Sequence, residues 1–199
     1  MVRHRGAAGR PGRWHPMFIQ GIKTQAYEIW EDLGHTAPDT IVLVAGSGSQ
    51  VIGHDLAWHE LERADAVDQV PRLVMVQPAS AAPLVDAFAK GADDVEPVVP
   101  AATMAEGTAI GNPVRGREVL VALRRCNGLA VATSEDAIAA ATRTLAGRGL
   151  WAEPTSANAY AGYRALRDAG QLDGTGTTVL VLTGSGHKCA ARMVEVFGG

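Results

Sequence analysis

The sequence contains little cysteine, few aromatic residues and no long apolar run. Cys126 and Cys189 are its two cysteines, and 5% of its 199 residues are aromatic. Two distant cysteines without a CxxC pair give no disulfide framework and no cysteine-rich zinc site, so a reducing cytoplasm is the expected location. Because no apolar run approaches the length of a membrane span, no membrane partner is expected.

An excess of charge of one sign is also missing. The formal net charge is −3, with 20% charged and 47% hydrophobic residues. A chain this close to neutrality has no general affinity for nucleic acid, so none is expected as a partner. Residues 1–13 differ from the rest, with four arginines and no acid. We predict a disordered basic leader over residues 1–13 and one folded domain over residues 14–199.

The most informative stretch is a strand, a turn and a helix in direct succession. Residues 40–45 are rich in Val, Ile and Leu, residues 46–50 are small and polar, and apolar residues then recur at helical spacing up to Leu61. Such a turn directs several backbone N–H groups and the positive end of a helix to one spot, which suits a phosphate. An ordinary strand-to-helix connection explains the same pattern, and the pattern alone leaves both interpretations open.

The same alternation continues along the chain. Residues 14–21 are predicted to be extended, because the residue before a proline avoids the helical region. Strands are predicted over residues 40–45, 72–77, 129–133, 150–153 and 178–183, and helices over residues 22–33, 51–61, 82–90, 116–125, 135–147, 155–169 and 187–197. Strands that alternate with helices of this length favour an α/β fold, a three-layer parallel sheet with helices on both faces.

Three polar turns follow predicted strands, at residues 46–50, 153–156 and 183–186. In an open parallel sheet, ligands bind outside the carboxyl ends of the strands, so these turns mark the expected site. A dinucleotide is not the expected ligand. The glycine spacing departs from GxGxxG, and the second strand ends in Gln77 where a ribose-binding acid would stand.

A metal site is not predicted either. His54 and His59 are five residues apart, which does not place them on one face of a helix, and no acid cluster joins them.

Six short segments, taken in order, resemble the motifs of one enzyme family. They are His15-Pro16, Gly21-Ile-Lys23-Thr24, Ala45 to Ser49, Ala109-Ile-Gly-Asn-Pro113, Glu153-Pro-Thr-Ser-Ala157 and Thr183-Gly-Ser-Gly-His-Lys188. In this order they are similar to threonine synthases, which belong to the fold-type II pyridoxal-phosphate enzymes together with tryptophan synthase β-like proteins. The likeness covers residues 14–199 and corresponds to the C-terminal portion of that family.

The resemblance implies pyridoxal 5'-phosphate as cofactor and a small-molecule amino-acid substrate. Gly46, Ser47, Gly48 and Ser49 would hold the cofactor phosphate through backbone amides, and Thr183 would hydrogen-bond the pyridine nitrogen. Glu153 and Ser156 would shape the floor of the pocket. The implied activity is that of a lyase that converts phosphohomoserine to threonine. From the residues alone, an ordinary strand residue at Thr183 and an ordinary helix cap at Glu153 are the simpler explanations.

One departure from the family matters most. The portion that carries the Schiff-base lysine has no counterpart here, and Lys23, Lys90 and Lys188 are not suited to that role. We therefore predict no catalytic residue in this chain and no activity of the chain alone, with a missing N-terminal half or a homodimer as partner. Two alternatives stay open: another fold-type II enzyme, of the threonine dehydratase or cysteine synthase type, and a truncated domain without catalysis.

Overall fold

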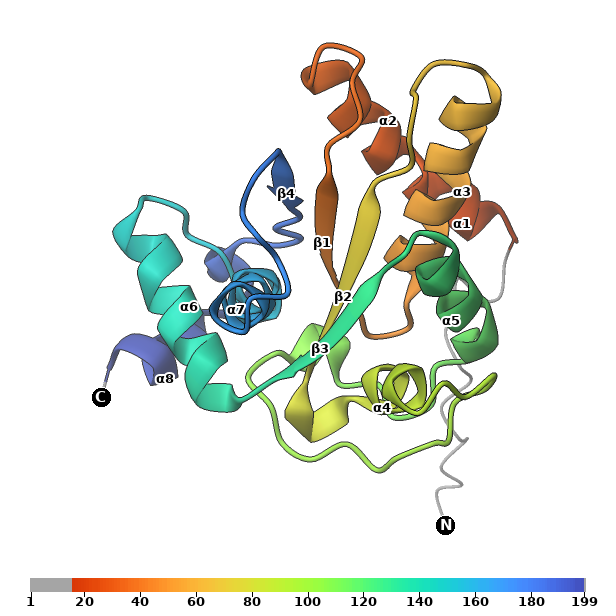
Figure 1. Cartoon of the computed structure of the whole chain (residues 1–199). Helices are drawn as coiled ribbons and strands as arrows, with labels where there is room; N and C mark the ends of the chain where they lie inside the picture. The colour runs from red at the N-terminus through yellow and green to blue at the C-terminus, as the bar shows by residue number, and fades with distance from the viewer. Residues whose placement is uncertain (1–15, 199) are drawn as a thin grey trace.

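A four-stranded parallel sheet forms the centre of the molecule (Figure 1). The computed structural model describes residues 16–198, so the predicted leader over residues 1–13 lies outside the described residues. The strands are β1 (Thr40–Val44), β2 (Arg72–Pro78), β3 (Leu129–Thr133) and β4 (Thr178–Leu180), in the order β3-β2-β1-β4. All five residues of β1 are buried, because this strand lies between two others and is covered on both faces.

Helices cover both faces of the sheet (Figure 1). One face is covered by α1 (Pro16–Ile22), α2 (Thr24–Asp32), α3 (Ser49–Arg63), α4 (Pro83–Ala89) and α5 (Gly116–Arg125). The other face is covered by α7 (Pro154–Asp168), with α6 (Glu135–Gly147) and α8 (Ala190–Phe197) outside it. Among the described residues there are also three short 3-10 turns, η2 (Ala79–Ala81), η3 (Glu106–Thr108) and η4 (Gly186–Cys189). The predicted three-layer α/β fold is therefore confirmed.

The alternation of side chains along β1 divides the core into two parts. Ile41 and Leu43 pack with helices α1 to α5, whereas Val42 and Val44 pack with α7. Gly162 brings α7 close to the sheet, since a Cβ at this position would overlap with the methyl groups of Val76. The sheet is thus held from both sides, and its carboxyl edge is left for the loops that form the candidate site.

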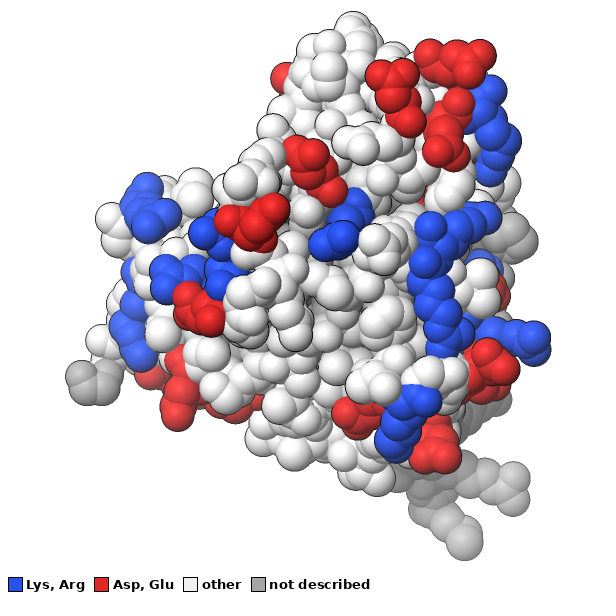
Figure 2. Space-filling model, viewed as in Figure 1, with Lys and Arg blue, Asp and Glu red and all other residues white. Residues whose placement is uncertain are grey.

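The surface carries both signs of charge. On the face drawn in Figure 2, Lys and Arg side chains are interspersed with Asp and Glu and surround a broad area without charged residues. Within residues 16–198, no helix is both long and apolar enough to cross a membrane.

Near the N-terminus, the structure differs from two local predictions. Residues 16–22 form helix α1 instead of an extended segment. Proline restricts the residue before it, but its own fixed φ suits the first position of a helix. The helix predicted over residues 22–33 is α2, and it begins two residues later than predicted, because Ile22 is the last residue of α1.

Near the C-terminus, the predicted strand over residues 150–153 is absent, and only Ala152 makes an isolated antiparallel bridge, with Ser185. Strand β4 ends at Leu180 instead of Thr183. The reason is a set of local hydrogen bonds. The Gly184 N–H donates to Ser156 Oγ over 2.6 Å, and its carbonyl accepts from the Glu153 N–H over 3.1 Å. Residues 184–186 therefore join the 151–156 segment and leave the sheet, and α8 begins only at Ala190.

Candidate functional site

The turn between β1 and α3 uses glycine where no other residue fits. Gly48 has a φ of +77°, in the left-handed region, and a Cβ there would overlap with Val119 Cγ2 of α5. A Cβ on Gly46 would lie 3.2 Å from the carbonyl oxygen of Gly107 and 3.0 Å from Ile110 Cδ1. The turn is therefore wedged between α5 and the segment that contains η3.

This turn presents unused hydrogen-bond donors. Within the described residues, the backbone amides of Gly46, Ser47 and Gly48 donate no hydrogen bond. Helix α3 begins at Ser49, so its first amides and the positive end of its dipole face the same spot. The Ser47 hydroxyl donates to Ser49 Oγ over 3.4 Å, so the Ser49 hydroxyl adds one further free donor. Free amides at a helix N-terminus are the arrangement that binds phosphate in proteins.

A cavity of about 370 Å³ opens in front of these donors. Its lining consists of Ile22, Val44, Gly46, Ser47, Gly48, Ser49, Gln50, Gly107, Thr108, Ile110, Glu153, Thr155, Thr183 and Lys188. The five residues predicted to bind the cofactor, Gly46 to Ser49 and Thr183, thus lie around one cavity. The turns that follow β1 and β4 stand at the same edge of the sheet, as the parallel arrangement predicts. The volume is within the range of small-ligand pockets.

A fixed hydroxyl pair forms the other end of the cavity. Ser156 is fully buried at the start of α7, and its Oγ lies 3.0 Å from Thr183 Oγ1. Because Ser156 also accepts a hydrogen bond from the Gly184 N–H, its position is set by the backbone. The Glu153 carboxylate lies against Gly184, where a Cβ would overlap with it. Thr183 itself is exposed towards the cavity and positioned by Ser156.

Sequence reasoning gave no role to several residues of this cavity. Gly107 and Thr108 lie between the helices predicted over residues 82–90 and 116–125, and the Gly107 N–H donates to Thr155 Oγ1 over 3.1 Å. This bond ties η3 to the start of α7 and completes the wall opposite Gly46. Lys188 also lines the cavity. The family resemblance points to this part of the cavity, since Ala109 to Pro113 and Lys188 belong to the motifs that carry it.

Gln77 supports the turn between β1 and α3. Its side chain is fully buried; Nε2 donates to the Ala45 carbonyl over 3.1 Å, and Oε1 accepts from the amides of Leu84 and Val85 at 2.9 and 3.1 Å. One side chain therefore caps α4 and anchors the residue that precedes the turn. The residue that argues against a dinucleotide in the sequence thus has a structural role.

The three lysines lie in different surroundings. Lys23 is buried, and its Nζ is 2.9 Å from Gln20 Oε1 and 2.5 Å from Glu60 Oε2. Burial alone would lower the pKa of Lys23, but its interactions with Glu60 and Tyr27 outweigh burial and raise the pKa. Lys90 follows α4, away from the cavity, and Lys188 is exposed at the rim. Lys23 is thus held as a protonated structural residue.

His54 is a core residue of α3. Its Nε2 lies 2.9 Å from Gln25 Oε1, and its Nδ1 accepts from Trp58 Nε1 over 3.4 Å. Burial lowers the pKa of His54 from 6.5 to about 4, so the ring is neutral near pH 7. The side chain fixes α2 against α3 and has no contact with the cavity.

The geometry agrees with a comparison against known protein families. Residues 2–184 match the family described as "Pyridoxal-phosphate dependent enzyme". This match covers most of the chain, and the protein belongs to that family of pyridoxal-phosphate-dependent enzymes.

Among curated proteins, the chain is similar to threonine synthases. It is 32% identical over 175 residues to the threonine synthase of Methanocaldococcus jannaschii, an alignment that covers 87% of this chain and 43% of that protein. It is 31% identical to the enzyme of Methanosarcina acetivorans, with 92% of this chain and 45% of the relative covered. The chain therefore spans less than half the length of the curated relatives it matches, and it is partial relative to them.

Solved structures show the same fold. A fungal L-serine ammonia-lyase from Rhizomucor miehei superposes with a TM-score of 0.74 at 20% identity, covering 92% of this chain and 57% of that one. A threonine deaminase from Solanum lycopersicum gives a TM-score of 0.70 at 18% identity, with 92% and 50% covered. The identities are low, so these structures support the fold alone.

Proposed function

We propose that this chain supplies the phosphate and ring-nitrogen contacts of a pyridoxal-phosphate-dependent lyase of the threonine synthase type, which converts phosphohomoserine to threonine. The supporting observation is the single cavity that Gly46, Ser47, Gly48, Ser49 and Thr183 line together. The names of the curated relatives support this substrate. A cytoplasmic location belongs to the same proposal.

The residues of the cavity fit the cofactor from both ends. The free amides of Gly46 to Gly48 and the first turn of α3 would hold its phosphate, since they donate no hydrogen bond elsewhere in the described residues. Gly46 leaves no side chain between these donors and the wall at Gly107. When bound, the cofactor supplies an electron sink for elimination and replacement chemistry on an amino acid.

Thr183 would act at the ring nitrogen. Ser156 accepts from the Gly184 amide and lies 3.0 Å from Thr183 Oγ1, so the threonine hydroxyl is held in place. When Ser156 donates its single proton to Thr183 Oγ1 and not to the Gly184 carbonyl at 3.1 Å, the Thr183 proton is free to point into the cavity. A neutral hydroxyl donates a hydrogen bond without transferring its proton. This polarises the ring less than a carboxylate partner would, which suits β- and γ-replacement.

The catalytic lysine is not among the residues of this chain under this proposal. Lys23 is bound to Glu60, Lys90 is remote, and Lys188 is exposed at the rim. We therefore expect no turnover by the chain alone, and a partner that supplies the lysine: an N-terminal half or a second copy.

The alternative is another fold-type II enzyme, of the dehydratase or cysteine synthase type, to which the same cavity is suited. The solved structures named as threonine deaminase and serine ammonia-lyase share the fold, and this keeps that alternative open. A truncated domain without catalysis is the second alternative.

Titration with inorganic phosphate tests the proposed anion site. With isotope-labelled protein, we expect amide shifts at residues 46 to 50 and a dissociation constant near the millimolar range, which corresponds to roughly 4 kcal/mol. The affinity is weak because the contacts to the rest of the cofactor are absent from inorganic phosphate.

The best variant for this titration is Ser49→Asp, matched with Ser49→Ala. Ser49 is the first residue of α3, where aspartate is compatible with the helix, so the carboxylate repels phosphate without unfolding the protein. A Gly48→Asp variant also introduces a clash with Val119 and is less informative. We expect Ser49→Asp to abolish the shifts and Ser49→Ala to keep them. Silence at residues 46 to 50, with shifts elsewhere, would show that the assignment is wrong.

A further inference from the structure

A second group of polar side chains lies further along α3, away from the cofactor cavity. Asp55 and His59 occupy successive turns of α3, and Cys126 follows the last residue of α5. His59 Nδ1 lies 3.2 Å from Asp55 Oδ1, and Cys126 Sγ lies 3.3 Å from the same oxygen. None of the three residues lines the cofactor cavity.

The three atoms have the spacing of a metal-ligand set. One ligand atom from each residue lies within 4.8 Å of the other two. Bonds of about 2.0–2.3 Å to a tetrahedral zinc ion place neighbouring ligand atoms roughly 3.3–3.7 Å apart. The two distances from Asp55 are already close to that range. A carboxylate, an imidazole and a thiol are also the donors that zinc and cobalt prefer.

Arg125 contacts the cluster from outside, through hydrogen bonds to the Asp55 carboxylate. Its Nε donates to Asp55 Oδ1 over 2.9 Å, and its Nη2 donates to Asp55 Oδ2. A metal ion on Oδ1 would replace the first contact and leave the second, which would orient the carboxylate. The carboxylate and a thiolate would bring two negative charges to the divalent ion, with the positive charge of Arg125 next to them.

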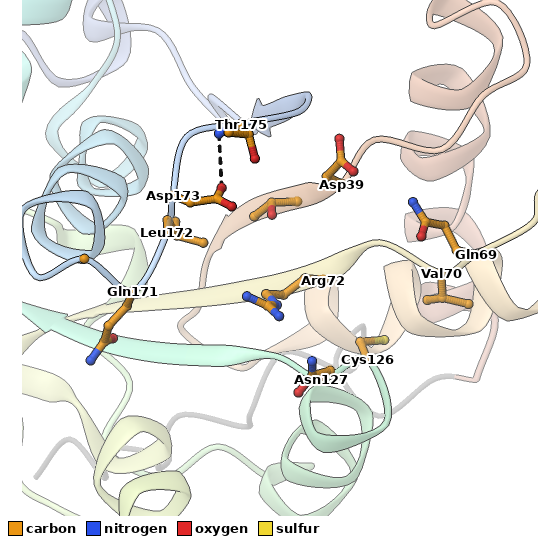
Figure 3. Close-up of a pocket in the computed structure, with 12 residues that line it drawn as sticks. Asp39, Gln69, Val70, Arg72, Cys126, Asn127, Gln171, Leu172, Asp173 and Thr175 are labelled. Atoms are coloured by element: carbon orange, nitrogen blue, oxygen red, sulfur yellow. Dashed lines mark hydrogen bonds between the residues drawn. The ribbon is translucent and has the colours of Figure 1, made fainter.

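The cluster lies between two hollows of the surface. One of about 440 Å³ is lined by Cys126 and Asn127 from the end of α5, together with Thr40 and Arg72 from the amino ends of β1 and β2. Figure 3 shows Cys126 next to Asn127 at the rim of this hollow. The other, of about 450 Å³, is lined by Asp55 and Arg125. Cys126 thus borders one hollow and Asp55 the other, so solvent reaches the cluster from two sides.

We propose that Asp55, His59 and Cys126 form a binding site for a divalent metal ion of the zinc type, at the edge of the sheet opposite the cofactor cavity. The ordinary alternative is a network in which Asp55 serves only to hold Arg125 and His59. The two interpretations differ in one respect: only the metal site requires the thiol of Cys126.

Binding involves a defined change of protonation. Burial raises the pKa of the Cys126 thiol, so the thiol is protonated in the metal-free protein. His59 Nδ1 lies 2.8 Å from the Asp55 carbonyl and carries the ring proton there. On binding, the thiol proton is released to solvent, and the imidazole proton moves to Nε2, so that Nδ1 becomes a ligand. One proton is released for each ion bound.

Titration of the purified chain with Co²⁺ tests this proposal, because a thiolate on cobalt gives a charge-transfer absorption in the near ultraviolet. We expect this band to saturate at one ion per chain. Cys126→Ser should remove the band. His59→Gln should weaken Co²⁺ binding by more than the roughly 10- to 100-fold loss typical of outer-shell residues.

Matched controls use residues of the same kind outside the cluster. Cys189→Ser should keep the band, since Cys189 is the last residue of η4 and not part of the cluster, and His187→Gln should keep the affinity. Retention of the band in Cys126→Ser, its loss in Cys189→Ser, or no saturable band in the unmodified chain would overturn the proposal. Circular dichroism verifies that each variant is folded. If Cys126→Ser does not fold, unchanged affinity in His59→Gln is itself sufficient to reject the site.

Discussion

The two halves of α3 use polar groups in opposite ways. In the turn that leads into its N-terminal end, the amides of Gly46 to Gly48 have no partner among the described residues, and they face a cavity. Further along the helix, Asp55 is in contact with Arg125, His59 and Cys126 at once and is 3% exposed. Under the proposed function, this end of the helix is preorganised for an anion that must come from outside. In the second half, every group of the cluster already has a partner within the chain.

This contrast has an energetic meaning. Unused donors cost little while water solvates them, so a substitution there should change binding more than stability. A buried carboxylate depends on its partners, so a substitution there should change stability first. The three predictions below test this difference, from the largest expected effect to the smallest.

Removal of Asp55 should have the largest effect on folding. Asp55→Ala leaves Arg125 and the Cys126 thiol without their common acceptor, and we expect the free energy of unfolding to fall by about 3 kcal/mol. This value is at the lower end of the loss expected when a buried ion pair is broken, because the Arg125 side chain is 43% exposed. Denaturant unfolding with a chelator present measures the change. Asp68→Ala, an exposed carboxylate in a loop, is the control, and equal losses in both variants would contradict the contrast.

Protonation of His54 should have the next largest effect. Its pKa is about 4 in the folded protein and 6.5 in the unfolded chain, because burial disfavours the charged ring. The unfolded state therefore binds more protons below pH 6.5, and stability is lost as the pH falls towards 4. Between about pH 7.5 and pH 5 we expect a loss on the order of 2 kcal/mol from this residue.

Unfolding curves at the two pH values, for the unmodified chain and for His54→Gln, measure the contribution of His54. The variant should show a flatter pH dependence, whatever its absolute stability. His187→Gln, which alters an exposed histidine near the cavity, should keep the original slope. A slope unchanged in His54→Gln would mean that burial of this ring does not control the acid sensitivity.

The smallest expected effect is at the lysines. When the chain is mixed with pyridoxal phosphate and reduced with borohydride, we expect no single lysine to be labelled stoichiometrically. Lys23 is held by Glu60, and the exposed side chain of Lys188 would lose conformational freedom to reach the cofactor. Peptide mapping by mass spectrometry provides the measurement. Full labelling of Lys23 or Lys188 alone would contradict the prediction, whereas scattered partial labelling is the ordinary reaction of exposed amines.

Most of the fold follows from the pattern along the chain. Strand β3 has the predicted bounds, and β1 and β2 differ from prediction by a single residue at one end. These strands are continuous apolar runs with glycine or polar residues at their ends, so the local signal is strong. Residues 150–153 begin with an apolar run of the same kind, but this run is shorter. Its backbone groups form hydrogen bonds with residues 184–186 instead of with a strand of the sheet.

In the site, too, the residues of local motifs were predicted, whereas the contacts between distant residues were not. Gly46 to Ser49 and Thr183 are found around one cavity, while their contacts with the cofactor stay a prediction. Gly107 and Thr155 could not be assigned, because the bond between them joins residues 48 positions apart. In the sequence, Gln77 serves only as an argument against a dinucleotide ligand. Its three hydrogen bonds depend on where α4 and the turn meet, which no local pattern contains.

The sequence by itself determined the alternation of strands and helices, the parallel sheet, and the glycine turn after β1, because each depends on residues that are adjacent in the chain. Only the tertiary structure decided which polar groups meet. Asp55 and Cys126 are 71 positions apart, and Ser156 and Thr183 are 27 apart. These contacts exist because α3 and α5 pack on one face of the sheet and α7 on the other, and that packing is set by the whole core.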